Sequence, residues 1–300
     1  MPGVRTGSGG RNLRRLLAGR EVVVAPGVFS PVVAQLARRV GFRAIYFSGG
    51  GFANLLGLPD LGVTTLTEVA NWAKGITSAV NLPLIVDVDT GFGETVNVQR
   101  TVWEMERAGA AAIHLEDQVM PKRCGHLEGK EIVETEAMVK KIIAAREARS
   151  GELVLIARTD ARAVEGFDAA VERSRTYVKA GADMVFPEAL ENRGEFSEFA
   201  KKVRVPLLAN MTEFGKTPYI TASKFGEMGY KVVIFPMTAF RATLKTVLDT
   251  FRELKKSGTQ RALLRRMMTR KEIYDFMNYY EYEEHDQRTL RKARRILGTD

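Results

Sequence analysis

The only cysteine of the chain lies beside charged groups that could set its protonation. It sits in the segment Lys122-Arg123-Cys124-Gly125-His126. Adjacent cations lower the pKa of a thiol, and an imidazole can exchange a proton near neutral pH. The segment therefore predicts a reactive thiol in a polar loop. A Cys–His hydrolase is one interpretation of these residues alone, and a small buried hydrophobe is the other common role of a lone cysteine.

Three carboxylates at the ends of apolar runs predict a divalent cation site. Asp87 and Asp89 are two positions apart, so on a strand their side chains leave the same face. Glu116 ends the next such run and could join directly or through water. Oxygen ligands without a His or Cys cluster favour Mg²⁺, with Mn²⁺ as an alternative, over zinc. The competing interpretation is that one aspartate caps a helix or pairs with an arginine.

Other segments predict binding of a small molecule with several negative charges. Ser48-Gly49-Gly50-Gly51 exposes backbone N–H groups that suit a carboxylate or phosphate, although such a turn is as often only structural. Arg158 and Arg241 follow strand-like runs and could bind carboxylates with their forked guanidinium groups, whereas Arg270 alone would be taken as solvated. Further polar residues end other runs, namely Glu188, Asn210 and Thr212.

Eight short β-branched runs must position these residues. We expect strands at Val22–Ala25, Ala44–Ser48, Leu84–Asp89, Ala112–Glu116, Val154–Thr159, Met184–Glu188, Leu207–Asn210 and Val232–Pro236. Amphipathic stretches link them, and glycine ends four of these just before a strand, at Gly41, Gly109, Gly181 and Gly229.

Parallel strands joined by helical crossovers predict a (β/α)8 barrel, with a doubly wound open sheet as the alternative. Chemistry in such a barrel gathers at the carboxyl ends of the strands. We expect an extra helix at Arg11–Leu17, a barrel domain over 1–258 with a short N-terminal arm, and a helical extension over 259–300. The extension holds many aromatic residues, so we expect it to pack on another subunit or on its own barrel.

Composition excludes several classes of protein. One cysteine in 300 residues makes no intramolecular disulfide, which favours a reducing compartment such as the cytoplasm. The net charge of +9 is spread through helices that mix both signs, so we expect no nucleic-acid partner, and no apolar run is long enough to span a membrane. A basic, barrel-shaped binding protein is the non-enzyme alternative.

Three segments together resemble the isocitrate lyase and phosphoenolpyruvate mutase superfamily over nearly the whole chain. They are the segment 122–126, Tyr46-Phe47-Ser48-Gly49-Gly50, and Asp87-Val88-Asp89-Thr90-Gly91-Phe92-Gly93. The run K-R-C-G-H is typical of the carbon–carbon lyases in that group. The segments 210–215 and 235–241 are similar to the branch that cleaves 2-methylisocitrate, and the chain is short for an isocitrate lyase.

The resemblance implies Mg²⁺-dependent cleavage of 2-methylisocitrate to pyruvate and succinate, the last step of the methylcitrate route of propionate catabolism. It implies Mg²⁺ near Asp87, Asp89 and Glu116, Tyr46 as a candidate base, and Cys124 as the acid that protonates the succinate carbanion. Substrate contacts are implied for Ser48, Gly49, Gly50, Gly125, Arg158, Glu188, Asn210, Thr212, Arg241 and Arg270, with Asp60, Lys122 and His126 in support.

The resemblance also implies a homotetramer that exchanges C-terminal helices. Isocitrate lyase activity is the nearest rival, because a hydrophobic pocket distinguishes one methyl group by only about 1–3 kcal/mol. An oxaloacetate decarboxylase or a phosphonate-forming mutase on the same barrel is a second rival.

Overall fold

The computed structural model describes residues 9–299. The chain divides into two compact units, Met1–Thr243 and Leu244–Asp300, so that the division falls inside helix α11 (Thr238–Ser257). The predicted N-terminal arm lies mostly outside the described residues. The extra helix expected near residue 11 is present as α1 (Gly9–Ala18).

Eight parallel strands close into the predicted barrel. One set of neighbours runs β2-β3-β4-β5-β6 and the other β1-β8-β7, and parallel bridges from Gly27 to Tyr46 and from Val185 to Leu207 join the two sets. The strands are β1 (Val23–Pro26), β2 (Ile45–Phe47), β3 (Leu84–Asp87), β4 (Ala112–Glu116), β5 (Val154–Thr159), β6 (Met184–Pro187), β7 (Leu208–Asn210) and β8 (Val232–Phe235).

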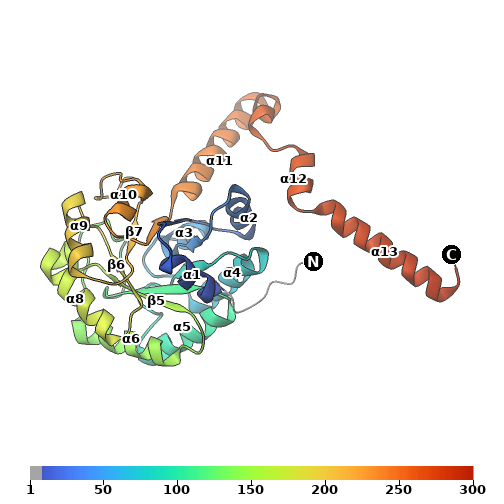
Figure 1. Ribbon diagram of the computed structural model, residues 1–300. Helices are drawn as coiled ribbons and strands as arrows, with labels where there is room; N and C mark the ends of the chain where they lie inside the picture. Colours follow the sequence, from blue (N-terminus) through green and yellow to red (C-terminus); the bar gives the residue numbers. More distant parts are fainter. Residues whose placement is uncertain (1–8, 300) are drawn as a thin grey trace. The chain divides into compact units, whose positions relative to one another are not determined.

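Helices surround the strands on the outside, as Figure 1 shows for α5, α6, α8 and α9. Their apolar faces pack on the outer side of the sheet, and side-chain oxygens of Ser30, Thr65, Asn192 and Thr221 cap their first turns. The helices of the barrel unit are α2 (Pro31–Val40), α3 (Gly49–Leu55), α4 (Leu66–Ala79), α5 (Thr95–Arg107), α6 (Thr135–Ala148), α7 (Ala161–Val164), α8 (Phe167–Ala180), α9 (Arg193–Lys202) and α10 (Ala222–Glu227).

Helix α1 covers one end of the barrel interior, and the buried side chains at that end are apolar. Leu13 and Leu17 of α1 join the same buried cluster as Val23, Val154 and Val232, which lie in the first half of their strands. Arg14 of α1 donates to the carbonyl oxygens of the segment that leads into β5. This end of the barrel is therefore a packed hydrophobic plug.

Two local predictions need correction. The glycine-rich segment after β2 is not an open turn: Ser48 is the N-cap of α3, and its side chain accepts a hydrogen bond from Gly51 N at 3.1 Å. The third strand ends at Asp87, and Asp89 has left it with a φ of 47°. The four glycines expected to end helices all have positive φ, from 79° to 118°, as predicted.

The second unit is helical and has almost no core of its own. It contains most of α11, the 3-10 helix η1 (Arg261–Arg266), α12 (Arg270–Phe276) and α13 (Tyr279–Leu297). Among its described apolar residues only Leu263 is buried, whereas Phe251, Tyr282 and Ile296 are largely exposed. Packing of this extension on a neighbouring subunit remains a prediction.

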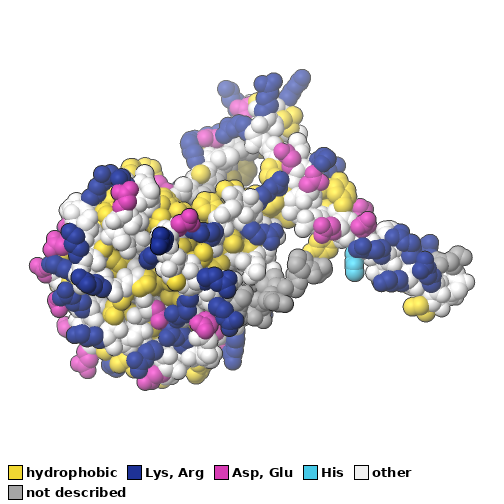
Figure 2. All heavy atoms as spheres, in the orientation of Figure 1, with side chains coloured by type: hydrophobic (Ala, Val, Ile, Leu, Met, Phe, Trp, Pro, Cys, Tyr) yellow, Lys and Arg dark blue, Asp and Glu magenta, His cyan; other side chains and the backbone are white. Residues whose placement is uncertain are grey.

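The charge of the surface is mixed. On the face of the barrel seen in Figure 2, basic and acidic side chains alternate rather than gather by sign. Within residues 9–299, no helix is both long and apolar enough to cross a membrane.

Candidate active site

The carboxyl ends of the strands surround a cavity of about 190 Å³. Side chains that continue the interior face of each strand line it, because alternate strand residues point the same way. Most of the predicted site residues meet here: Tyr46, Ser48, Gly50, Asp60, Asp87, Lys122, Cys124, Gly125, His126, Arg158, Glu188, Asn210, Thr212 and Arg241. Asn54, Phe186, Pro236 and Met237 complete the wall.

Asp87 and Asp89 face a common point beside the start of α3. Asp87 accepts hydrogen bonds from the backbone N–H of Gly49 and of Asp89, each at 3.1 Å. A Cβ atom on Gly49 would lie 3.0 Å from Asp87 Oδ2 and 3.0 Å from Asp89 Oδ1, so only glycine lets the backbone approach both carboxylates. Gly49 therefore helps to shape the carboxylate pair.

Burial and nearby charge set the two aspartates apart. Burial raises the pKa of Asp89 to about 6, although Lys122 opposes this. Burial also acts to raise the pKa of Asp87, but His114, Lys122 and Arg158 outweigh it and leave that pKa below its usual value. Lys122 Nζ lies 2.9 Å from Asp89 Oδ1 and also contacts Asp60. Asp87 is thus ionised at neutral pH, and Asp89 loses its proton only when the pH rises through about 6.

The backbone N–H of Glu116 donates to the Asp89 carbonyl at 2.9 Å, while its side chain faces Arg158. Its Oε2 is 3.0 Å from an Arg158 nitrogen, and its buried Oε1 has no hydrogen-bond partner within the described residues. Burial raises the pKa of Glu116 well above its usual value. No cluster of three His, Cys, Asp or Glu side chains shaped for a metal ion occurs in residues 9–299, so the predicted ligand set is not assembled directly.

The site nevertheless suits a hard cation. The converging oxygens of Asp87 and Asp89 and the unpartnered Oε1 of Glu116 are oxygen donors of the kind that Mg²⁺ takes, often with water between. A bound divalent ion would also offset the repulsion between these buried carboxylates. The donor set therefore fits Mg²⁺ held by the aspartate pair, with Glu116 behind it.

Tyr46 is a protonated phenol in a buried polar group. Its hydroxyl lies 2.9 Å from His114 Nε2 and 3.4 Å from Asp87 Oδ2, and its ring stacks on that of His114. Burial, followed by the charge of Asp87, raises the pKa of Tyr46 well above its usual value. The prediction that Tyr46 acts as a base therefore needs a partner that removes its own proton.

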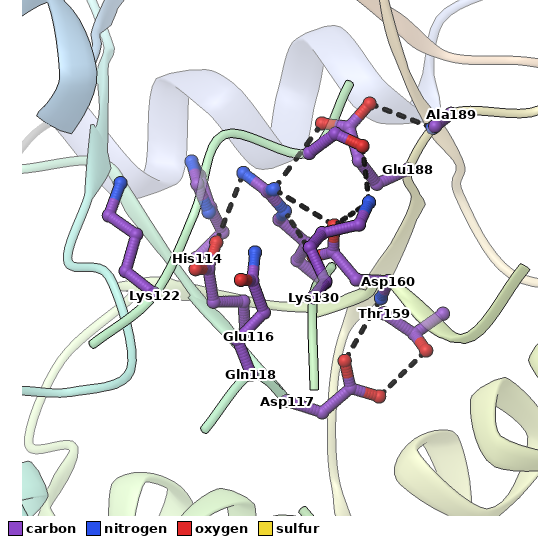
Figure 3. A network of polar contacts seen from close by, with 12 residues as sticks. His114, Glu116, Asp117, Gln118, Lys122, Lys130, Thr159, Asp160, Glu188 and Ala189 are labelled. Carbon is purple, nitrogen blue, oxygen red and sulfur yellow. Dashed lines mark hydrogen bonds and ion pairs between the residues drawn. The ribbon is translucent and has the colours of Figure 1, made fainter. Parts of the chain in front are cut away.

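The loop that carries Cys124 is held to the barrel at several points, some of which appear in Figure 3. The side chain of Gln118 makes two hydrogen bonds of 2.9 Å to the backbone of Arg123. His126 Nε2 lies 3.2 Å from Glu188 Oε1, while its Nδ1 accepts from Lys216 N at 3.1 Å. Both ring nitrogens are thus engaged away from the thiol, which argues against a Cys–His hydrolase.

The expectation of a lowered thiol pKa is wrong. Burial raises the pKa of Cys124, and the backbone N–H of His126 opposes this only in part. Lys122 and His126 do not activate the thiol, because they pair with carboxylates instead. The half-buried thiol is therefore protonated at neutral pH, as a proton donor must be.

Arg158 is a buried cation of the cavity wall that lies among carboxylates, with Glu116 at 3.0 Å. It lies 3.0 Å from an oxygen of Asp160 and 3.6 Å from one of Glu188, and its guanidinium sits over the ring of Phe186. The charge of Arg158 keeps the pKa of Glu188 far below its usual value despite burial. Asn210 donates to Glu188 at 3.2 Å, and its buried Oδ1 is without a hydrogen-bond partner in the described chain.

The predicted arginines separate into two groups. Arg158 and Arg241 line the cavity, and Arg241 donates to the side chain and the carbonyl of Glu213 at 2.7 Å and 2.8 Å. Arg270 begins α12 in the second unit and is exposed. Its contact with substrate remains a prediction.

Comparisons with known proteins place the chain in a family. The model of the phosphoenolpyruvate phosphomutase family matches residues 13–255. A 2-methylisocitrate lyase from Aeropyrum pernix is 57% identical over 95% of this chain and 92% of its own length. The chain belongs to the phosphoenolpyruvate phosphomutase family, among its 2-methylisocitrate lyases. The corresponding lyase from Bacillus subtilis is 48% identical over 93% of this chain and 92% of the relative.

Solved structures of the family agree with the barrel. A 2,3-dimethylmalate lyase is 35% identical with a TM-score of 0.87, and the match covers 96% of each chain. A phosphonopyruvate hydrolase in complex with oxalate and Mg²⁺ is 31% identical with a TM-score of 0.85, over 94% of this chain and 99% of the other. The fold prediction is confirmed.

Three buried residues near the cavity were given no role in the site by the sequence prediction. His114 could have been found, because it lies two residues before Glu116 on β4 and so shares its face. Asp160 directly follows β5 and pairs with Arg158. Lys130 gave no signal, because a lysine in a polar loop is normally solvated, yet its side chain is only 1% exposed.

Proposed function

We propose that this enzyme cleaves 2-methylisocitrate to pyruvate and succinate with the help of Mg²⁺. The observation that carries the proposal is a protonated cysteine in a small cavity that is also lined by Asp87, the first carboxylate of the aspartate pair, and by two arginines. The cavity of about 190 Å³ has the size of a small polycarboxylate. Support comes from relatives of similar length that bear the name of this lyase.

Asp87 and Asp89 would hold the cation, with Glu116 acting directly or through water. When bound, Mg²⁺ lowers the pKa of the substrate hydroxyl and stabilises negative charge on the pyruvate part. The solved relative with oxalate and Mg²⁺ supports a divalent metal in this family. The protein supplies the rest of the site.

Other polar groups that line the cavity would bind the carboxylates of the substrate. Arg158 and Arg241 provide guanidinium groups, and Asn210 and Thr212 provide neutral donors. Ser48, Gly50 and Gly125 would add hydroxyl and backbone donors, whereas the N–H of Gly49 is donated to Asp87. Glu188 orients Arg158 and Asn210. In the tetramer, Arg270 would reach a site through the exchanged extension.

Different groups of the site would remove and deliver protons. Tyr46 Oη would take the proton of the substrate hydroxyl while its own proton moves to His114 Nε2, 2.9 Å away. Burial lowers the pKa of His114 to about 4, so its ring is neutral and Nε2 can offer a lone pair to this proton, which returns to Tyr46 when the hydroxyl proton is released. The C2–C3 bond then breaks, its electron pair remains on the succinate part, and the Cys124 thiol protonates that carbon.

The surroundings of the site match this chemistry. The loop that carries Cys124 would exclude water, which would otherwise protonate the carbanion in place of the thiol. A thiol that must stay reduced fits a reducing compartment, and we assign the enzyme to the cytoplasm. The exposed apolar side chains of the second unit support a homotetramer, since they would be covered there.

The test is an assay of both products with both candidate substrates. Pyruvate release from 2-methylisocitrate and glyoxylate release from isocitrate are measured with Mg²⁺, each by a coupled enzyme. We expect pyruvate well in excess of glyoxylate. Glyoxylate in excess would make the protein an isocitrate lyase, and no product from either acid would overturn the proposal and direct attention to oxaloacetate and other 2-oxo acids.

A further inference from the structure

Lys130 is a buried cation at the far end of the loop that carries Cys124. Its side chain is 1% exposed, and its ammonium lies 2.9 Å from Asp160 Oδ1. The same ammonium donates to the carbonyl oxygen of Gly125, the residue that follows Cys124. Figure 3 shows Lys130 reaching across toward Asp160 beside Glu188. One side chain thus ties the loop to the barrel next to the thiol.

The partner of Lys130 is itself fixed by the barrel. Asp117, just after β4, accepts hydrogen bonds from Asp160 N at 2.9 Å and from the hydroxyls of Thr159 at 2.7 Å and Tyr177 at 2.8 Å. The Asp160 carboxylate also accepts from Arg158 at 3.0 Å and 3.3 Å. The anchor therefore rests on two strands and on α8 rather than on another loop.

Gly125 is held from the opposite side as well. A Cβ atom at this position would lie 2.3 Å from Glu188 Cγ and 2.7 Å from an Arg158 nitrogen. The Gly125 backbone therefore sits directly against the wall of the cavity while its carbonyl faces Lys130. Any movement of Lys130 away from Asp160 would release the backbone that sets the position of Cys124.

We propose that Lys130 is a positioning residue that, through Asp160 and the Gly125 carbonyl, holds the Cys124 thiol where it can protonate the substrate carbanion. The inference rests on the proposed lyase function for the identity of the acceptor carbon. The placement of the thiol itself does not depend on that function. An ammonium suits the task because it donates to a carboxylate and a carbonyl at once.

The decisive variant is Lys130→Met, which keeps the length of the side chain and removes its donors. It leaves Asp160 paired with Arg158, so no buried carboxylate loses its only partner, and we expect the protein to fold. Lys231→Met is the matched control, because Lys231 also donates to a backbone carbonyl, that of Gly19, but far along the chain from the site.

Two readouts separate positioning from general stability. The first is the rate at which iodoacetamide alkylates Cys124, the only thiol of the chain, as a function of pH. We expect Lys130→Met to react several-fold faster and with a lower thiol pKa, because burial is what raises that pKa in the parent. The second is turnover of 2-methylisocitrate, where we expect kcat to fall by about 10²-fold with KM little changed.

The outcomes distinguish the two proposals. If Cys124 is alkylated faster in Lys130→Met, and at the parent rate in Lys231→Met, the role of Lys130 is supported even if 2-methylisocitrate is not the substrate. Alkylation at the parent rate and pKa in a folded Lys130→Met protein overturns it, as does an unchanged kcat when the parent cleaves 2-methylisocitrate. If Lys130→Met does not fold, Lys130→Gln, which keeps one donor but loses the charge, decides by the same criteria.

Discussion

The two ends of the barrel interior are built from the same strands but from opposite chemistry. Along β5, Val154 and Ile156 join the apolar cluster under α1, and Arg158, on the same face, enters the cavity. Along β6, Met184 is followed in the same way by Phe186 and Glu188. Two residues along a strand are enough to pass from the hydrophobic plug to buried charge.

The difference shows how this fold separates stability from function. Apolar burial at the α1 end stabilises the barrel without directional contacts, whereas the charged end buries carboxylates and cations that are costly unless paired. The pKa values at that end reflect this cost, because burial raises the pKa of both Asp89 and Glu116. Substitutions at the two ends should therefore change different quantities.

The largest effect should come from removing the cation at the charged end. Treatment with EDTA should reduce pyruvate release from 2-methylisocitrate to background, and excess Mg²⁺ should restore it, because Asp87 and Asp89 alone cannot stabilise the developing negative charge. Thermal unfolding of the EDTA-treated protein serves as the control for folding. Full activity in the presence of EDTA would show that the carboxylate pair has another purpose.

A smaller effect, on stability rather than on activity, should follow from Leu13→Ala at the α1 end. Leu13 is fully buried, so its truncation should lower the free energy of unfolding by about 3 kcal/mol. Denaturant unfolding measures this loss, and kcat should remain near that of the parent. Leu36→Ala, at a half-exposed leucine of α2, should cost clearly less, and an equal cost would remove the distinction between plug and surface.

The smallest effect concerns the pH dependence of metal binding. The pKa of Asp89 is about 6 in the metal-free protein, and only the ionised carboxylate binds a cation. The Kd for Mg²⁺ should therefore be nearly constant above pH 7 and should rise by about tenfold for each pH unit below 6. Calorimetric titration measures it, and a Kd that is the same at pH 5 and pH 7 would contradict the assigned role of Asp89.

The architecture and most of the site could be predicted from the sequence because they depend on local patterns. β-branched runs, glycine helix ends and polar residues at strand ends are all visible in order along the chain. Asp87, Asp89, Arg158 and Glu188 continue the interior face of their strands or follow it closely, so finding the strands also located them.

The remaining properties depend on distant contacts that no local pattern shows. The sequence placed Lys122 and His126 beside Cys124, yet the fold pairs them with Asp60 and Glu188, which reverses the expected shift of the thiol pKa. A lysine in a polar loop is expected to be solvated, and only the folded chain brings Lys130 to Asp160. Glu116 was expected at the metal directly or through water, and no local pattern shows that its side chain also pairs with Arg158.

The most direct test of the account is the turnover of Cys124→Ser at saturating Mg²⁺ and 2-methylisocitrate. Serine is a much weaker acid than the thiol in the same place, so we predict that pyruvate release falls by about 10³-fold while the circular dichroism spectrum and the unfolding temperature match the parent. A folded Cys124→Ser protein with near-parental turnover would remove Cys124 from the chemistry and contradict the account.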